Sequence, residues 1–297
     1  MADELLIADR PELERPVLVG AFRGWNDGAQ GASLAAGYLA KQWAAEEFAT
    51  IDPEGFFDFQ ATRPHVALVE GVTRRIDWPE TNFYHCRPEG LDRDVVILLG
   101  IEPNLRWKTF SNLVVGLAHD LGVELFVTLG ALLADVPHTR PAPVTGSASD
   151  PELVESLGLS PSRYEGPTGI VGVVHDACRE AGVPSASLWA AVPHYVSLTP
   201  SPRAALSLCE RLGTLLGVEV PTDELEQAAT AYEEQVSEAV ASDEETAAYV
   251  EELENRADTL EEQGDLPSGD ALAAELTRFL REREQDNGES GPRGPAD

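Results

Sequence analysis

The chain has 297 residues, of which 43% are apolar and 25% are charged, and its net charge is −31. A surface this acidic repels a phosphate backbone, so nucleic acid is excluded as an expected partner. No stretch of about 18 apolar residues occurs, so no membrane-spanning helix is expected. The first ten residues carry acidic side chains where a secretion signal needs cations, so we expect a cytoplasmic protein.

Over the first 221 residues, apolar strands alternate with amphipathic helices. We expect strands at residues 16–22, 66–69, 94–99, 123–129 and 186–192, and helices at 29–47, 105–121, 169–181 and 203–216. This alternation predicts an α/β domain over residues 1–221, with a mainly parallel sheet sandwiched by helices.

Two segments interrupt the alternation. Residues 52–85 are crowded with Phe56, Phe57, Phe59, Trp78 and Phe83 and with three prolines. We expect an irregular excursion or a β-hairpin there, over one end of the sheet and at a subunit contact. Residues 136–163 are rich in Pro, Ser and Gly and are expected to form a long loop.

The C-terminal segment differs in composition from the domain before it. From Thr222 to Asp297 there are 23 acidic and 5 basic residues, a net charge of −18, which leaves −13 of the total −31 for residues 1–221. We expect an acidic helical extension over residues 222–284, followed by a disordered tail over residues 285–297. Its first helix covers residues 222–240, and a capping box at Ser242–Glu245 starts the second. A third helix is expected to turn inward Leu272, Leu276, Phe279 and Leu280.

The second helix of this extension carries a narrow apolar seam among acidic residues. The seam consists of Val250, Leu253, Ala257 and Leu260. Because an apolar stripe on a helix needs a surface to cover it, we predict that the seam packs on the domain or on a neighbouring subunit.

Polar residues that follow the strands, or precede a helix, form a candidate pocket. In an open parallel sheet, ligands bind beyond the carboxyl ends of the strands. The candidates are Asn26, Asp27, Glu102, His138, Arg140, Thr168, His194 and Tyr195. One interpretation is an acid–base pair with an anion-holding arginine. The alternative is structural: Asp27 and Thr168 cap helices, Glu102 pairs with Arg106 or Arg140, and the histidines bond loop backbones.

Metal and cofactor sites lack the spacing they need. Cys86, Cys178 and Cys209 are scattered and fit neither a disulfide framework nor a zinc site, so we expect small buried hydrophobic residues. Residues 20–28 do not fit the dinucleotide fingerprint, because the bulky Trp25 stands where the backbone must approach a pyrophosphate. We therefore expect no metal and no cofactor.

Short motifs spread along the chain carry a family resemblance. They are Pro16–Gly28, Arg63–Pro64, Gly100–Pro103 with Trp107, Pro137–Arg140, Gly166–Ile170, Leu188–Trp189, Pro193–Tyr195 and Pro200–Pro202. In this order, over roughly residues 12–255, they resemble the PAC2 family, named for proteasome assembly chaperone 2. The long form with an acidic helical tail looks like the actinobacterial branch of that family.

The resemblance implies a fold similar to nucleoside phosphorylases and hydrolases. It also implies a non-catalytic assembly chaperone or interaction protein, since archaeal and eukaryotic relatives hold proteasome α subunits without ATP. Homo-oligomers are common in the family, and a trimer is our first expectation. Relatives often dock through a C-terminal hydrophobic–Tyr–any tripeptide, which the sequence Pro295-Ala296-Asp297 does not match. The alternative function is an enzyme or small-molecule binder that uses the crevice at the carboxyl ends of the strands.

Overall fold

The computed structural model describes residues 4–69, 73–148, 150–161, 164–196 and 198–263. A nine-stranded sheet within these ranges has the strand order β1-β3-β6-β7-β2-β8-β11-β9-β10. In that order the strands span Leu5–Ile7, Glu46–Ile51, Thr81–Cys86, Val95–Ile101, Val17–Arg23, Leu125–Ala134, Ser185–Pro193, Val144–Ala148 and Ser160–Pro161. The central strands β7, β2, β8 and β11 are parallel. The strands outside them pair antiparallel, except β9 with β10.

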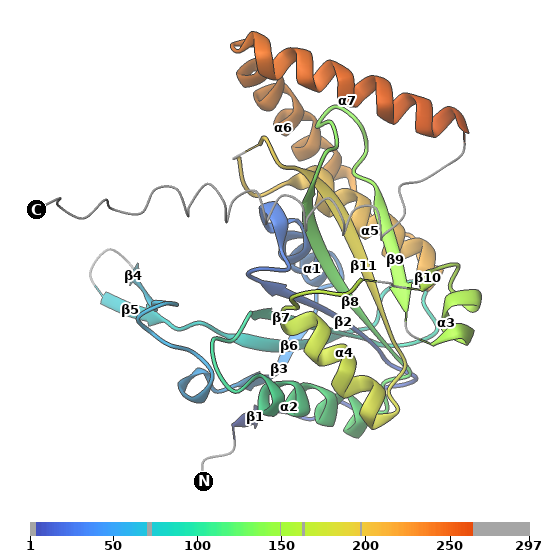
Figure 1. The fold of residues 1–297 in the computed structure, drawn as a ribbon. Coiled ribbons are helices and arrows are strands. Elements are labelled where there is room, and N and C mark those ends of the chain that lie inside the picture. Colours follow the sequence, from blue (N-terminus) through green and yellow to red (C-terminus); the bar gives the residue numbers. More distant parts are fainter. Residues whose placement is uncertain (1–3, 70–72, 149, 162–163, 197, 264–297) are drawn as a thin grey trace, which may run out of the picture.

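The alternating side chains of β2 show how the sheet builds a core on each face. Val17, Val19 and Ala21 are buried in one hydrophobic cluster, together with residues of α1 (Gly31–Gln42) and α5 (Pro202–Leu216). Leu18 and Phe22 belong to the other, together with residues of α2 (Trp107–Asp120) and α4 (Ile170–Ala181). A strand covered on both faces must be apolar at every covered position, as β2 is from Val17 to Phe22. The two helix pairs lie on opposite sides of the sheet (Figure 1), and the expected α/β fold class is confirmed.

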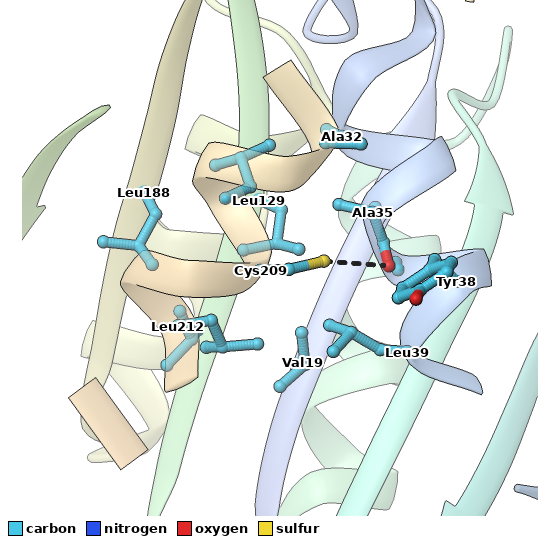
Figure 2. Close-up of a cluster of buried hydrophobic side chains, with 14 of the residues drawn as sticks. Val19, Ala32, Ala35, Tyr38, Leu39, Leu129, Leu188, Cys209 and Leu212 are labelled. Atoms are coloured by element: carbon cyan, nitrogen blue, oxygen red, sulfur yellow. Dashed lines mark hydrogen bonds between the residues drawn. The ribbon is translucent and has the colours of Figure 1, made fainter. Parts of the chain in front are cut away.

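The core between the sheet and the pair α1–α5 contains a cysteine. Figure 2 shows Cys209 among aliphatic side chains, with its Sγ 3.8 Å from the backbone oxygen of Ala35. Burial raises the pKa of the Cys209 thiol to about 12, so the group stays neutral. Cys86 and Cys178 are buried as well, with exposed fractions of 7% and 0%. All three cysteines are free and act as small hydrophobic residues, as expected.

A separate two-stranded hairpin projects from the sheet between β3 and β6. It consists of β4 (His65–Val69) and β5 (Thr73–Asp77), which pair antiparallel as a sheet of their own. A short 3-10 helix at Pro53–Gly55 precedes it in the chain, and the rings of Phe59 and Trp78, one before and one after the hairpin in sequence, lie 4.9 Å apart. The aromatic segment therefore contains a hairpin, which was one of the two forms expected.

The structure differs from the expected elements at several places. The strand expected over residues 66–69 is β4 of the separate hairpin, whereas β1 and β6 join the main sheet without having been expected. The helix expected over residues 29–47 ends at Gln42, because Ala44 takes a left-handed φ of 47°, and the following residues form β3. Residues 136–163 are not one long loop but contain β9, α3 (Pro151–Ser156) and β10. Pairing of β9 with β11 overrides its weak local strand pattern. The second helix of the extension is capped by Asp243, whose carboxylate accepts from the backbone N of Thr246, rather than by a box starting at Ser242.

Two acidic helices continue from α5. Helix α6 (Asp223–Ala241) packs on α5, and its Leu225 belongs to the same buried cluster as α5 residues such as Leu212. Helix α7 (Glu244–Gln263) packs on α6 and lies across the connection between β8 and β9 (Figure 1). The predicted third helix and the predicted tail over residues 285–297 lie outside the described residues. In the part of the chain that the structure describes, no helix is long and apolar enough to cross a membrane.

Candidate functional site

The first group of candidate residues surrounds Glu102, which directly follows β7. One carboxylate oxygen, Oε2, accepts a hydrogen bond from the backbone N of Trp25 at 3.1 Å. The other, Oε1, accepts from Asn26 Nδ2 at 3.4 Å and from the backbone N of Ile170 at 2.8 Å. Ile170 is the first residue of α4, where the helix dipole favours a negative charge. Glu102 therefore joins the loop after β2 to the start of α4, rather than pairing with an arginine.

Gly169 allows this close approach. A Cβ at that position would lie 2.2 Å from Asn26 Nδ2 and 2.7 Å from Glu102 Oε1. Gly169, not Thr168, is the N-cap residue of α4, and it makes no side-chain capping bond. The exposed Thr168 donates its hydroxyl only to the backbone oxygen of Gly169, at 3.4 Å. The expected cap by Thr168 is therefore wrong, because the carboxylate of Glu102 occupies that role from another loop.

Asp27 is engaged at the start of α1. Its Oδ1 accepts from the backbone N of Ala32 at 2.8 Å and of Ser33 at 3.2 Å, and its Oδ2 accepts from Ser33 Oγ at 2.6 Å. Burial raises the pKa of Asp27, while these hydrogen bonds oppose that rise. The residue is only 6% exposed, and its main chain bridges to Ala131 in β8. The contacts match the structural interpretation, in which Asp27 caps a helix.

The second group of candidates centres on His138, which is 2% exposed. The Tyr195 hydroxyl accepts from the backbone N of His138 at 2.9 Å and lies 2.8 Å from its Nδ1. In the tautomer with the ring hydrogen on Nε2, the hydroxyl donates its one hydrogen to Nδ1. Nε2 lies 3.0 Å from Ser237 Oγ on α6. Burial lowers the pKa of His138 and raises that of Tyr195 to about 12, so both are neutral near pH 7.

An aromatic cluster extends this group toward α7. The rings of His194, Tyr195 and Tyr249 lie 5.8–6.0 Å apart and meet edge to face. Edge-to-face pairs at this separation stabilise a contact beyond the area they bury. His194 Nδ1 also lies 3.3 Å from a carboxylate oxygen of Asp135, which follows β8. Because Tyr249 belongs to α7, the extension contributes one of the three rings.

Arg140 anchors α7 through a two-pronged ion pair. Its Nε and Nη2 lie 2.7 and 2.9 Å from the two carboxylate oxygens of Asp258. Its Nη1 lies 3.6 Å from Glu254, which also accepts from the Thr139 hydroxyl. A fork-to-fork arrangement of this kind fixes orientation as well as contributing energy. The arginine expected to hold an anionic ligand therefore holds two carboxylates of the chain itself.

The eight candidates thus fall into two groups with different neighbours. Asn26, Glu102 and Thr168 lie with Trp25 and Gly169 where β2, β7 and α4 meet, and Asp27 follows at the start of α1. His138, Arg140, His194 and Tyr195 lie on the connections after β8 and β11, against α6 and α7. Among the described residues, no group of three or more His, Cys, Asp or Glu side chains is placed to hold a metal ion.

Sequence reasoning missed the α7 residues that complete the second group. They are Tyr249, Glu254 and Asp258. The signal was present: Glu254 and Asp258 are four residues apart and share a helix face, which is the face that a cation can bridge. In the apolar seam, Val250 and Leu253 are 5% and 4% exposed, whereas Ala257 and Leu260 are half-buried. The seam thus already has cover within one chain.

The fold and the residues at the carboxyl ends of its strands define a class of protein. It is an α/β protein in which these residues hold the loops and an acidic helical extension together. The PAC2 family profile matches residues 21–240, about three quarters of the chain, and the chain belongs to the PAC2 family. A search of curated proteins returns no significant match.

Solved structures agree with this assignment. A PAC2 family protein from Streptomyces avermitilis is 49% identical, with a TM-score of 0.74, over 79% of this chain and 99% of its own. A proteasome-assembly chaperone homologue from Mycobacterium tuberculosis is 48% identical, with a TM-score of 0.72, over the same shares. PbaB, an archaeal proteasome activator from Pyrococcus furiosus, is 17% identical with a TM-score of 0.64, over 79% of this chain and 97% of its own, and shares the fold.

Proposed function

We propose that this protein is a non-catalytic, ATP-independent assembly chaperone of the cytoplasm that binds proteasome α subunits. The observation that carries the proposal is the 48% identity to a protein named as a proteasome-assembly chaperone homologue, over 99% of that chain. Membership of the PAC2 family supports a chaperone-like role in general. Binding to proteasome α subunits in particular is our own inference.

The chemistry of the strand-end residues supports a binding role rather than a reaction. A general acid or base has to reach a substrate proton. Instead, Glu102 accepts from two backbone N–H groups and an amide, and both ring nitrogens of His138 lie within bonding distance of protein hydroxyls. Arg140 is held by Asp258 through both prongs of its fork. These groups stiffen the loops and α7, which is what a docking surface requires.

Helix α7 offers the partner an acidic face. Glu251 and Glu252 are exposed, while Val250 and Leu253 face inward. Since α7 is tied to the connection after β8 by Arg140, this face is presented in a fixed orientation. We infer that the acidic face of α7 steers and contacts a basic patch of an α subunit.

The test is binding of the full chain to purified proteasome α subunits from its source organism, without ATP, followed by native gel electrophoresis and light scattering. We expect a complex with free α subunits and faster appearance of assembled particles when β subunits are added. The variant Glu251→Lys/Glu252→Lys should weaken the complex, whereas Glu89→Lys/Glu155→Lys, which makes the same charge change at other exposed positions, should not. Absence of any complex with α subunits would refute the proposal.

A further inference from the structure

The Glu102 carboxylate makes no ion pair with any residue that the structure describes. The sequence offers Arg106 and Arg140 as its partners. Arg106 Nη1 lies 2.5 Å from a carboxylate oxygen of Glu4 instead. Arg140 is bound by Asp258 on α7. Because Glu102 is half-buried, solvent screens its charge less than that of an exposed carboxylate, and the charge still attracts a cation.

Arg23 is close to Glu102 along the backbone, but its side chain lies on the other face of the sheet. The backbone oxygen of Arg23, at the end of β2, accepts from the backbone N of Glu102 at 2.8 Å. Side chains alternate along a strand, so Arg23 follows Val19 and Ala21 onto the face covered by α1 and α5. Glu102 bonds to the start of α4, which covers the opposite face. Arg23 therefore does not neutralise Glu102.

One oxygen of Glu102 can accept a further hydrogen bond. Each carboxylate oxygen has about two acceptor positions. Oε1 uses both, on Asn26 Nδ2 and on the backbone N of Ile170. Oε2 uses one, on the backbone N of Trp25. The second position on Oε2 remains for a donor from outside the described chain.

Asn26 supplies another acceptor beside this oxygen. Its side chain is 4% exposed, and its Nδ2 faces Glu102 because an amide oxygen in that place would be repelled. Its Oδ1 accepts no hydrogen bond within the described part of the chain and remains open to solvent. Polar atoms of so buried a side chain are ordinarily paired, so the open Oδ1 points to a group that binds there.

Trp25 adds an exposed aromatic face next to these two acceptors. Its indole is 43% exposed and contacts no other aromatic ring among the described residues. The turn that carries it is fixed, since Trp25 N donates to Glu102 and the backbone oxygen of Asn26 accepts from Ala131 in β8 at 2.9 Å. A fixed indole face loses little freedom on binding, and indole attracts cations more strongly than the other aromatic rings do.

We propose that Trp25, Asn26 and Glu102 bind a guanidinium group. This cation is flat, so it lies on the indole face while its edge donates to Glu102 Oε2 and Asn26 Oδ1. An ammonium is a compact charge that cannot stack in this way. An anion is excluded, because Glu102 already occupies the N-terminus of α4 and the chain has a net charge of −31. The guanidinium belongs to a free small molecule or to an arginine side chain of another polypeptide.

The first test is isothermal titration calorimetry of the full-length protein with two guanidinium compounds. They are agmatine, a free small molecule, and the peptide acetyl-Gly-Arg-Gly-amide. We expect both to bind, with the peptide tighter if the source is a polypeptide and agmatine tighter if it is a small molecule. The same peptide with citrulline in place of arginine keeps the shape without the charge and should bind at least about ten-fold more weakly. Equal binding of the citrulline peptide, or no binding of either guanidinium compound at millimolar concentration, would overturn the proposal.

The second test assigns the binding to these residues. Trp25→Leu keeps an apolar side chain but removes the aromatic face, and it should weaken agmatine binding about five- to ten-fold. Glu102→Gln should weaken it at least about ten-fold. The matched controls Trp78→Leu and Glu89→Gln change exposed residues elsewhere and should bind as wild type does.

Folding of the variants is checked by urea unfolding, because Glu102 also holds the start of α4. Trp25→Leu changes an exposed side chain and therefore tests the site independently of that contact. Unchanged affinity in Trp25→Leu, or in folded Glu102→Gln, would overturn the proposal. These measurements use no proteasome subunit, so their failure is distinct from failure of the proposed function.

Discussion

Replacing His175 by glutamine should remove a large part of the acid sensitivity of this fold. His175 lies on α4, and its Nε2 is 2.8 Å from the Thr128 hydroxyl while its Nδ1 is 2.9 Å from the Ser185 hydroxyl. Those hydroxyls belong to β8 and β11 and are 1% and 7% exposed, respectively. Burial lowers the pKa of His175 to about 4, against an ordinary value of 6.5.

The lowered pKa sets the direction and size of the effect. Between pH 6.5 and about 4 the unfolded chain binds a proton at this histidine and the folded chain does not, so acid favours unfolding. Linkage over that gap gives about 3 kcal/mol in full, of which about 2 kcal/mol is lost between about pH 7 and about pH 5. Because the side chain of His175 is only half-buried, these two free energies are upper limits.

The assay is urea unfolding followed by tryptophan fluorescence at the two pH values, for wild type and for His175→Gln. The variant is less stable at neutral pH, because glutamine replaces only part of the hydrogen bonding, but its loss on acidification should be smaller by about 2 kcal/mol. Contributions of the carboxylates are common to both proteins and cancel in the difference. His119→Gln removes an exposed histidine and controls for the substitution. Identical acid losses for wild type and His175→Gln would refute the reasoning.

Three further predictions concern the strand-end contacts. Gly169→Ala forces a Cβ against Glu102 and should lower the free energy of unfolding by about 1–3 kcal/mol. The measurement is urea unfolding, and an unchanged free energy would contradict the prediction. Asp27→Ala should cost about 1–2 kcal/mol and Asp27→Asn clearly less, since the amide oxygen still accepts from the first turn of α1; equal losses would contradict the capping role. Arg140→Ala should raise hydrogen exchange in α7 while leaving α2 unchanged, and equal protection of α7 would show that the ion pair does not hold it.

Much of the sheet could be predicted from the sequence because its central strands are apolar on both faces. Residues 17–22 of β2 are an uninterrupted apolar run, β7 is apolar throughout, and β8 and β11 are mainly apolar with a few small polar residues such as Thr128 and Ser187. The flanking strands β3 and β9 are half-exposed and polar at several positions, so their local patterns are weak. Pairing with β6 and β11, which comes from distant parts of the chain, decides them.

The candidate site could be predicted only as a set of residues, not as contacts. Asn26, Glu102 and His138 were found because they follow strands, and the structure places them at strand ends. The partner of Glu102 could not be predicted, because it is the backbone of Ile170, 68 positions further along the chain. The partner of Arg140 lies on α7 and depends on how the extension folds back, which helical periodicity alone does not fix.

The most direct measurement of the central claim is sedimentation of the full chain with free proteasome α subunits from its source organism, in the absence of ATP. The account predicts a discrete complex that contains both proteins and that disappears once β subunits complete the particle. It also predicts that Glu251→Lys/Glu252→Lys weakens this complex more than Glu89→Lys/Glu155→Lys does. Independent sedimentation of the two proteins at every concentration tested would contradict the chaperone role.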